Sequence, residues 1–185
     1  MKKYRFVLLL LVALLCQSCL RTSVRTRYFV LSQQAVAVQE LPAPVNLRRL
    51  SMPRYLKRWE LLLLDVDGEL HINDSALWGE TLNEGLRRSL RHSLGSDMWP
   101  QPEEAQNAWQ LDLDLRSFAG YLSGEFRVQA DCRLERGTAE KRFNLEFSLP
   151  FKSDRPDSLV KAHEAALRQI AALVAAELRL LCPGE

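Results

Sequence analysis

The sequence predicts an α+β two-layer sandwich, in which a mostly antiparallel mixed sheet carries two long helices on one face. Three consecutive segments in the second half of the chain alternate apolar and polar residues, which is typical of strands with one buried and one solvated face. Two other segments repeat apolar residues at helical spacing. Two amphipathic helices and a one-sided sheet bury their apolar surfaces most economically against each other.

The first half of the chain contains short strand candidates separated by turn residues. A loop is expected over residues 33–44, which contain two prolines and show no helical period, and Pro53 interrupts the chain again. The dipeptide Asp67-Gly68 predicts a hairpin turn after an apolar run that is typical of a buried strand. The predicted strands are Tyr28–Ser32, Val45–Leu50, Glu60–Val66 and Glu69–Ile72.

Two amphipathic segments predict the helices. The first is expected to begin at an N-cap supplied by Asn73, Asp74 or Ser75 and to end near Gly95. The second runs from about Ser158 to Leu181. The apolar positions of the first helix are Leu77 or Trp78, Leu82, Leu86, Leu90 and Leu94.

The three alternating segments predict an antiparallel meander. Asp112 and Asp114 fall on its polar face, where we expect solvated charge, because a carboxylate needs partial burial to become a useful acid. The apolar positions of the three strands are Trp109, Leu111, Leu113 and Leu115, then Phe126, Val128, Ala130, Cys132 and Leu134, then Phe143, Leu145, Phe147 and Leu149.

The N-terminus has the three parts of a secretory signal peptide. Basic residues at positions 2, 3 and 5 precede the apolar run Phe6–Leu15, which is shorter than the ~20 residues that span a bilayer. Lipoprotein signal peptidase requires a small residue before the modified cysteine; Ser18 before Cys19 meets this requirement, whereas Leu15 before Cys16 does not. We therefore expect a lipoprotein signal peptide over 1–18, a lipidated tether over 19–27 and a single domain over 28–182.

Leu20 follows the expected lipidation site. Under the usual sorting rule of Gram-negative bacteria, a residue other than aspartate at this position directs a lipoprotein to the outer membrane, facing the periplasm. Removal of residues 1–18 leaves 22 basic and 23 acidic side chains, so the mature chain gives no electrostatic reason to expect nucleic-acid binding. The stretch from Leu20 to Arg58 remains basic; it either lies on anionic headgroups or is a solvated tether.

The sequence contains no recognisable catalytic or metal-binding motif. His71, His92 and His163 are expected to be isolated surface side chains rather than metal ligands, and no cofactor motif occurs. Cys132 and Cys182 either form one disulfide or remain free thiols. The expected role is therefore non-catalytic.

The sequence resembles the auxiliary lipoproteins of ABC-type and MCE lipid-transport systems. The resemblance rests on Y-F-V-L-S from Tyr28, M-P-R-Y-L-K-R from Met52, L-W-G-E-T-L from Leu77, the strand W-Q-L-D-L-D-L and the Ala-rich last helix, all in the family's order. Met52, Lys57 and Trp59 depart from the leucine, aspartate and proline that are usual in the second motif.

The resemblance implies a subunit that helps to carry lipid between two membranes. The implied partner is an MCE-domain periplasmic protein of an inner-membrane system, and the implied assembly is a ring-like homo-oligomer. Pro53, Tyr55 and Leu56 would contact a partner or another subunit, with core packing as the alternative, and Trp59 is an expected exposed contact at an element end. Trp78, Glu80 and Leu82 form the third motif, whose role is expected to be structural.

Two other functions remain open from the sequence. One is a structural lipoprotein that assists another outer-membrane machine, such as lipopolysaccharide assembly. The other is a periplasmic hydrolase, which the lack of a nucleophile motif disfavours.

The lipidation site can be tested by single substitutions. Cys19→Ser should abolish fatty-acid labelling and membrane attachment, because it removes the modified thiol, whereas Cys16→Ser should be processed normally. Metabolic labelling and detergent partitioning measure both. The opposite pattern would move the anchor to Cys16.

Overall fold

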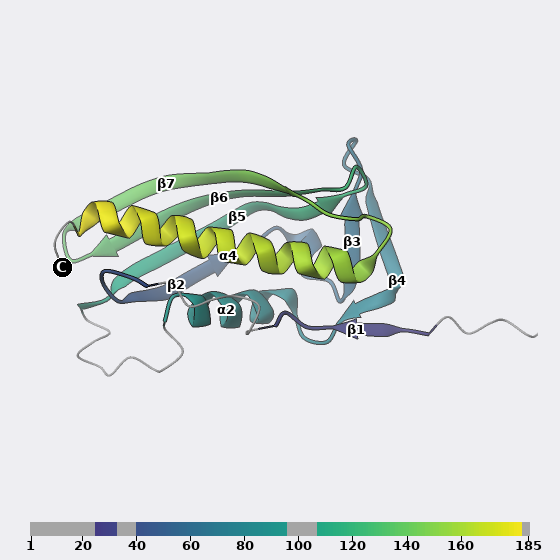
Figure 1. The fold of residues 1–185 in the computed structure, drawn as a ribbon, viewed down its shortest axis with the longest axis horizontal. Coiled ribbons are helices and arrows are strands. Elements are labelled where there is room, and N and C mark those ends of the chain that lie inside the picture. The colour runs from purple at the N-terminus through teal and green to yellow at the C-terminus, as the bar shows by residue number, and fades with distance from the viewer. Residues whose placement is uncertain (1–24, 33–39, 96–106, 183–185) are drawn as a thin grey trace, which may run out of the picture.

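A computed structural model describes residues 25–32, 40–95 and 107–182 of the chain (Figure 1). It confirms the predicted fold class: a seven-stranded mixed sheet with the order β1-β4-β3-β5-β6-β7, and β2 beside β5, carries two helices. The strands are β1 (Arg27–Phe29), β2 (Val45–Ser51), β3 (Glu60–Leu64), β4 (Leu70–Trp78), β5 (Trp109–Tyr121), β6 (Glu125–Arg136) and β7 (Ala139–Pro150). The helices are the single 3-10 turn η1 (Arg54–Leu56), α2 (Leu82–Ser93) and α4 (Pro156–Leu181).

Strands β5, β6 and β7 form the predicted antiparallel meander, and their apolar residues face the helices. Strand β5 extends beyond the predicted run. Up to Leu115 the odd-numbered residues of β5 face the core. A register irregularity between Leu115 and Ser117 shifts this alternation by one residue, so that the even-numbered Phe118 faces the core. After the irregularity, Ser117 and Tyr121 lie on the outer face of the sheet, away from the helices.

The predicted start of the first helix is wrong. Residues 73–75 belong to β4, which continues to Trp78 because β3 pairs with it on one side and β1 on the other. Helix α2 instead begins after Thr81, in a capping box: the Glu84 N–H donates to Thr81 Oγ1, and the Thr81 N–H donates to the Glu84 carboxylate, both at 3.3 Å. Trp78 therefore ends a strand rather than lying on a helical stripe.

His163 is buried in the core, contrary to the expectation of a surface side chain. Its ring lies 5.1 Å from Trp78, 5.3 Å from Phe118 and 4.6 Å from Phe126, measured between ring centroids. Its Nδ1–H donates to the Leu159 carbonyl at 2.8 Å, one turn earlier in α4. Burial lowers the pKa of His163 from 6.5 to about 4, so the folded protein holds this ring neutral.

Asp112 is not merely a solvated charge. Arg48 on β2 donates to both of its carboxylate oxygens and also contacts Glu135 at 2.9 Å. The hydrogen bond from Arg48 lowers the pKa of Asp112. Cys132 and Cys182 are both buried free thiols in the structure, and burial raises the pKa of Cys132 to about 12.

The one-sided burial of β5 predicts unequal effects at neighbouring positions. Leu113→Asp places an unpaired charge in the core, which should cost several kcal/mol against a typical total stability of about 5–15 kcal/mol. Asp112→Asn should change stability little, because the ion pair between Asp112 and Arg48 is open to solvent. Arg48 also retains its second ion pair, with Glu135, in this variant. Thermal and urea unfolding measure both; equal losses would contradict the one-sided strand.

The neutral buried His163 predicts a pH-dependent stability. Below pH 6.5 the unfolded chain binds a proton at this residue, whereas the folded chain does not until about pH 4. Stability is therefore lost as the pH falls through this window, by an amount on the order of 3 kcal/mol. His163→Phe should remove this part of the pH dependence. Urea unfolding at several pH values tests it, and parallel profiles for the two proteins would contradict it.

Candidate functional site on the outer face of the hairpin

The motif M-P-R-Y-L-K-R, which begins at Met52, places its side chains on both faces of the sheet. The Leu56 N–H closes η1 on the Pro53 carbonyl at 3.2 Å, and the Leu56 side chain enters the core with 4% of its surface exposed. Tyr55 lies on the outer face, where it is half-buried and shares a hydrogen bond with Ser117. Burial, and then the proximity of Tyr121, raises the pKa of Tyr55.

The motif L-W-G-E-T-L, which begins at Leu77, holds α2 against the sheet. Trp78 and Leu82 are both buried, at the end of β4 and the start of α2. Glu80 forms an ion pair with Arg88, and Arg88 also donates to the Leu31 carbonyl at 3.2 Å. These contacts tie the segment after β1 to the helix. Cys19 lies outside the described residues.

The outer face of the β3–β4 hairpin is apolar although no helix covers it (Figure 1). Leu64 pairs with Leu70 on β4 and with Tyr121 on β5, and residues that pair across neighbouring strands share a face. Leu62 and Ile72 pair in the same way. We define the hairpin patch as Tyr55, Leu64, Leu70, Ile72, Tyr121 and Leu122; the most exposed are Leu70 (36%), Ile72 (39%) and Leu122 (39%).

The charges around the hairpin patch are mainly acidic. Residues 61–78 contain four acidic side chains and no lysine or arginine. His71 Nε2 lies 3.9 Å from the Asp65 carboxylate. The Arg127 guanidinium lies 4.3 Å from the centroid of the Tyr121 ring and is paired with Glu125. The acidic residues are Asp65, Asp67, Glu69 and Asp74.

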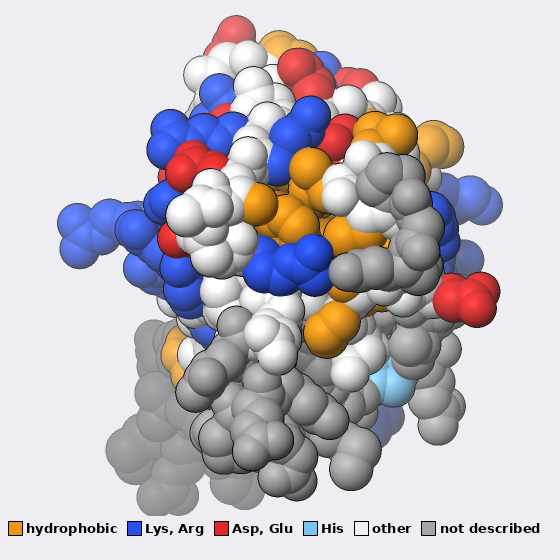
Figure 2. All heavy atoms as spheres, turned by 90° about the vertical axis from the view of Figure 1, so that its left-hand side faces the viewer, with side chains coloured by type: hydrophobic (Ala, Val, Ile, Leu, Met, Phe, Trp, Pro, Cys, Tyr) orange, Lys and Arg blue, Asp and Glu red, His pale blue; other side chains and the backbone are white. Residues whose placement is uncertain are grey.

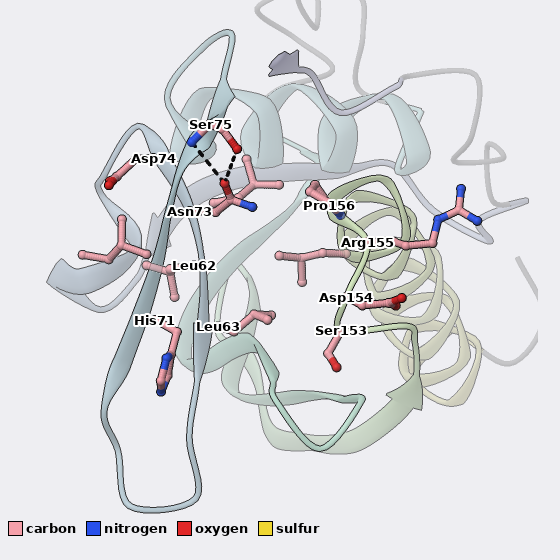
Figure 3. Close-up of a pocket in the computed structure, with 13 residues that line it drawn as sticks. Leu62, Leu63, His71, Asn73, Asp74, Ser75, Ser153, Asp154, Arg155 and Pro156 are labelled. Atoms are coloured by element: carbon pink, nitrogen blue, oxygen red, sulfur yellow. Dashed lines mark hydrogen bonds between the residues drawn. The ribbon is translucent and has the colours of Figure 1, made fainter. Parts of the chain in front are cut away.

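The inner face of the hairpin borders a groove of about 470 Å³ beside the start of α4. In Figure 3, Leu63 and Ser153 point toward the space between the hairpin and α4, whereas Asp74 points away from it. Gly120 permits this close packing, since a Cβ there would lie 2.6 Å from Leu159 Cδ1 and 2.7 Å from Phe151 Cζ. No cluster of metal-ligating side chains occurs within residues 25–32, 40–95 and 107–182.

The opposite end of the molecule, where α4 ends, also exposes apolar side chains, in a hollow beside Lys and Arg side chains (Figure 2). Sequence reasoning missed the hairpin patch because the Leu61–Leu64 run is typical of a strand buried on both faces. The available signal was Leu70 and Ile72, which alternate with Glu69 and His71 and so place two apolar residues on one face.

The fold and these surfaces define a small α+β domain with an apolar face that its helices leave uncovered. The family model for the ABC-type transport auxiliary lipoprotein component matches residues 29–175, so the chain belongs to this family. In the part of the chain that the structure describes, no helix is long and apolar enough to cross a membrane.

Two solved structures share the fold. One, described as an uncharacterized protein, superposes with a TM-score of 0.67 at 18% identity, covering 83% of this chain and 99% of that one. The other, protein XCC0632 from Xanthomonas campestris, described with the family model DUF330, superposes with a TM-score of 0.60 at 18% identity, covering 82% of this chain and 95% of that one. No curated protein matches the chain.

Proposed function

We propose that this protein is a non-catalytic auxiliary subunit of an intermembrane lipid-transport system, anchored through lipid on Cys19 in the outer membrane and facing the periplasm. Membership of the auxiliary lipoprotein family supports the transport role. The signal sequence, with Ser18 before Cys19 and Leu20 after it, supports the anchor and its membrane. The tether allows the domain a reach of only about 28 Å over residues 20–27 at full extension, so transport across the periplasm needs a partner.

The observation that carries the proposal is the hairpin patch. Leu70 and Ile72, with the partly buried Leu64 beside them, expose apolar surface on a sheet face that the protein's own helices leave uncovered, and residues 61–78 around it carry four acidic side chains and no lysine or arginine. Exposed apolar surface with a polar rim is typical of a protein-binding site. We infer that the patch binds an MCE-domain periplasmic protein of an inner-membrane system through an apolar surface flanked by lysine and arginine.

We also infer that copies of the chain associate around this partner as a homo-oligomer. Within the described residues, β1 and β7 form the two ends of the strand order. End strands carry backbone N–H and C=O groups that another chain can pair with. Pairing through β7, which runs from Ala139 to Pro150, would leave the hairpin patch of every copy open to the partner.

The hairpin patch can be tested with a double substitution, Leu70→Ser and Ile72→Ser. About a third of each side chain is exposed and available for burial, so each loss should weaken binding by roughly 1 kcal/mol, less than the 1.5–3 kcal/mol of full burial. Together they should lower affinity for the MCE-type partner roughly ten- to thirtyfold. Co-purification from the native membrane and titration with the partner measure this.

Leu180→Ser is the matched control, because Leu180 is also exposed but lies on the last turn of α4. It should bind like the wild type. Changes at Leu56 are unsuitable, since truncating this core residue would cost about 2–5 kcal/mol of stability. Unchanged partner binding by the folded hairpin variant would remove the patch from the proposal. A strict monomer in light scattering, with no affinity for any MCE protein of the same cell, would overturn the transport role.

A further inference from the structure

Exposed apolar side chains are concentrated at one end of the molecule, on the β3–β4 hairpin and the segments beside it. Of the eight large apolar side chains that are exposed among the described residues, seven lie on β1 or just after it, beside β3, on the hairpin, or in the β5–β6 turn. Three of them are close to the N-terminal entry and apart from the hairpin patch: Tyr28 at 69%, Val30 at 56% and Trp59 at 54% exposure. The hairpin patch does not account for these three.

Tyr28 and Trp59 are neighbours in the sheet although they are distant in sequence. Leu77 on β4 pairs with Tyr28 on one side and with Glu60 on the other. The Trp59 carbonyl accepts a hydrogen bond of 2.6 Å from the N–H of Trp78. Only β4 therefore separates the two aromatic residues, and two strand spacings place their backbones about 10 Å apart.

The same region is basic, in contrast to the hairpin. Residues 25–32 and 51–60 contain five basic side chains and one acidic side chain, Glu60. Arg58 contacts Glu60 at 3.2 Å. Arg27 lies near Asp157, which is already paired with Arg155 at 2.8 Å. We define the basic collar as Arg25, Arg27, Tyr28, Val30, Arg54, Lys57, Arg58 and Trp59, all of which are exposed.

The collar is also the part of the described domain nearest to the proposed anchor. Five residues lie between Cys19 and Arg25, and the six steps from one to the other allow roughly 20 Å at full extension. Tyrosine and tryptophan favour the lipid–water interface, where the ring is partly desolvated and its polar group stays hydrated. Lysine and arginine beside them are attracted to anionic headgroups.

We propose that the basic collar lies against the lipid–water interface of the membrane that holds the anchor, with Tyr28 and Trp59 at headgroup depth. This inference rests on lipidation at Cys19. The collar is at the base of the hairpin, and β4 leads from there to the tip over Leu70–Trp78 (Figure 1). Contact at the collar therefore directs the acidic tip of the hairpin, with Val66 exposed on it, away from the bilayer.

The test uses the full lipoprotein reconstituted in vesicles of phosphatidylcholine with about one-third phosphatidylglycerol. An environment-sensitive fluorophore is attached at Tyr28→Cys, at Trp59→Cys or, as the control, at Leu180→Cys, which is at least as exposed as either and lies at the other end of the domain. The native Cys132 and Cys182 are buried. Labels at 28 and 59 should be quenched by a shallow nitroxide phospholipid at least about twice as strongly as the label at 180, and should be shielded from iodide.

Reversing the charge of two collar residues gives an independent test. Arg54→Glu with Lys57→Glu should reduce nitroxide quenching at position 59 in the anionic vesicles, because both side chains are exposed and basic, and should have a smaller effect in pure phosphatidylcholine. The unfolding temperature should stay near that of the wild type.

The outcomes separate the collar from the anchor. Protein that floats with the vesicles but is quenched equally at 28, 59 and 180 overturns the collar alone. Labels that are shielded from iodide without nitroxide quenching show that another copy of the chain covers the collar, and also overturn it. Protein that does not float overturns the anchor at Cys19 and the collar together.

Discussion

Strand β5 changes its partner along one edge, and the layout of the molecule follows from this change. Strand β2 pairs with Trp109–Asp114, whereas β3 pairs only at Gly120 and Tyr121, and β6 pairs along the opposite edge throughout. The register irregularity near Ser117 falls at the changeover, where it alters which side chains face the helices. Strand β3 is held to β5 by two residue pairs only, and the β3–β4 hairpin runs steeply across the direction of the long strands (Figure 1).

The sequence predicts those parts of the fold in which burial is one-sided. The meander follows from strict alternation, which only a sheet with one wet face produces. The start of α2 could not be predicted in this way, because Ala76 and Trp78 fit a strand while Trp78 and Leu82 fit a helix. Whether residues 76–78 form a strand or a helix depends on β1, which is distant in the sequence and whose backbone pairs with the end of β4. His163 was missed for a similar reason, since its aromatic neighbours come from three different strands.

The candidate surfaces were only partly visible in the sequence. Trp59 stands at an element end, where exposure is expected, and the structure places it at the surface. The hairpin patch depends on register, because Leu64 faces Leu70 and Tyr121 only once three strands are aligned. Charge distinguishes the two surfaces: basic residues precede β3 and acidic residues follow it. One hairpin therefore carries opposite charge at its base and its tip.

The contacts just after β1 have a mechanical consequence. Any tension between the membrane and the domain enters through β1, a strand of three residues that would by itself peel easily from the edge of the sheet. The next residues are held by both helices: Arg88 of α2 donates to the Leu31 carbonyl, and the Ser32 N–H donates to Glu164 of α4 at 3.0 Å. Because Leu31 is also buried, the load passes into the helical layer and the core. A short strand can in this way serve as the attachment point of the whole domain.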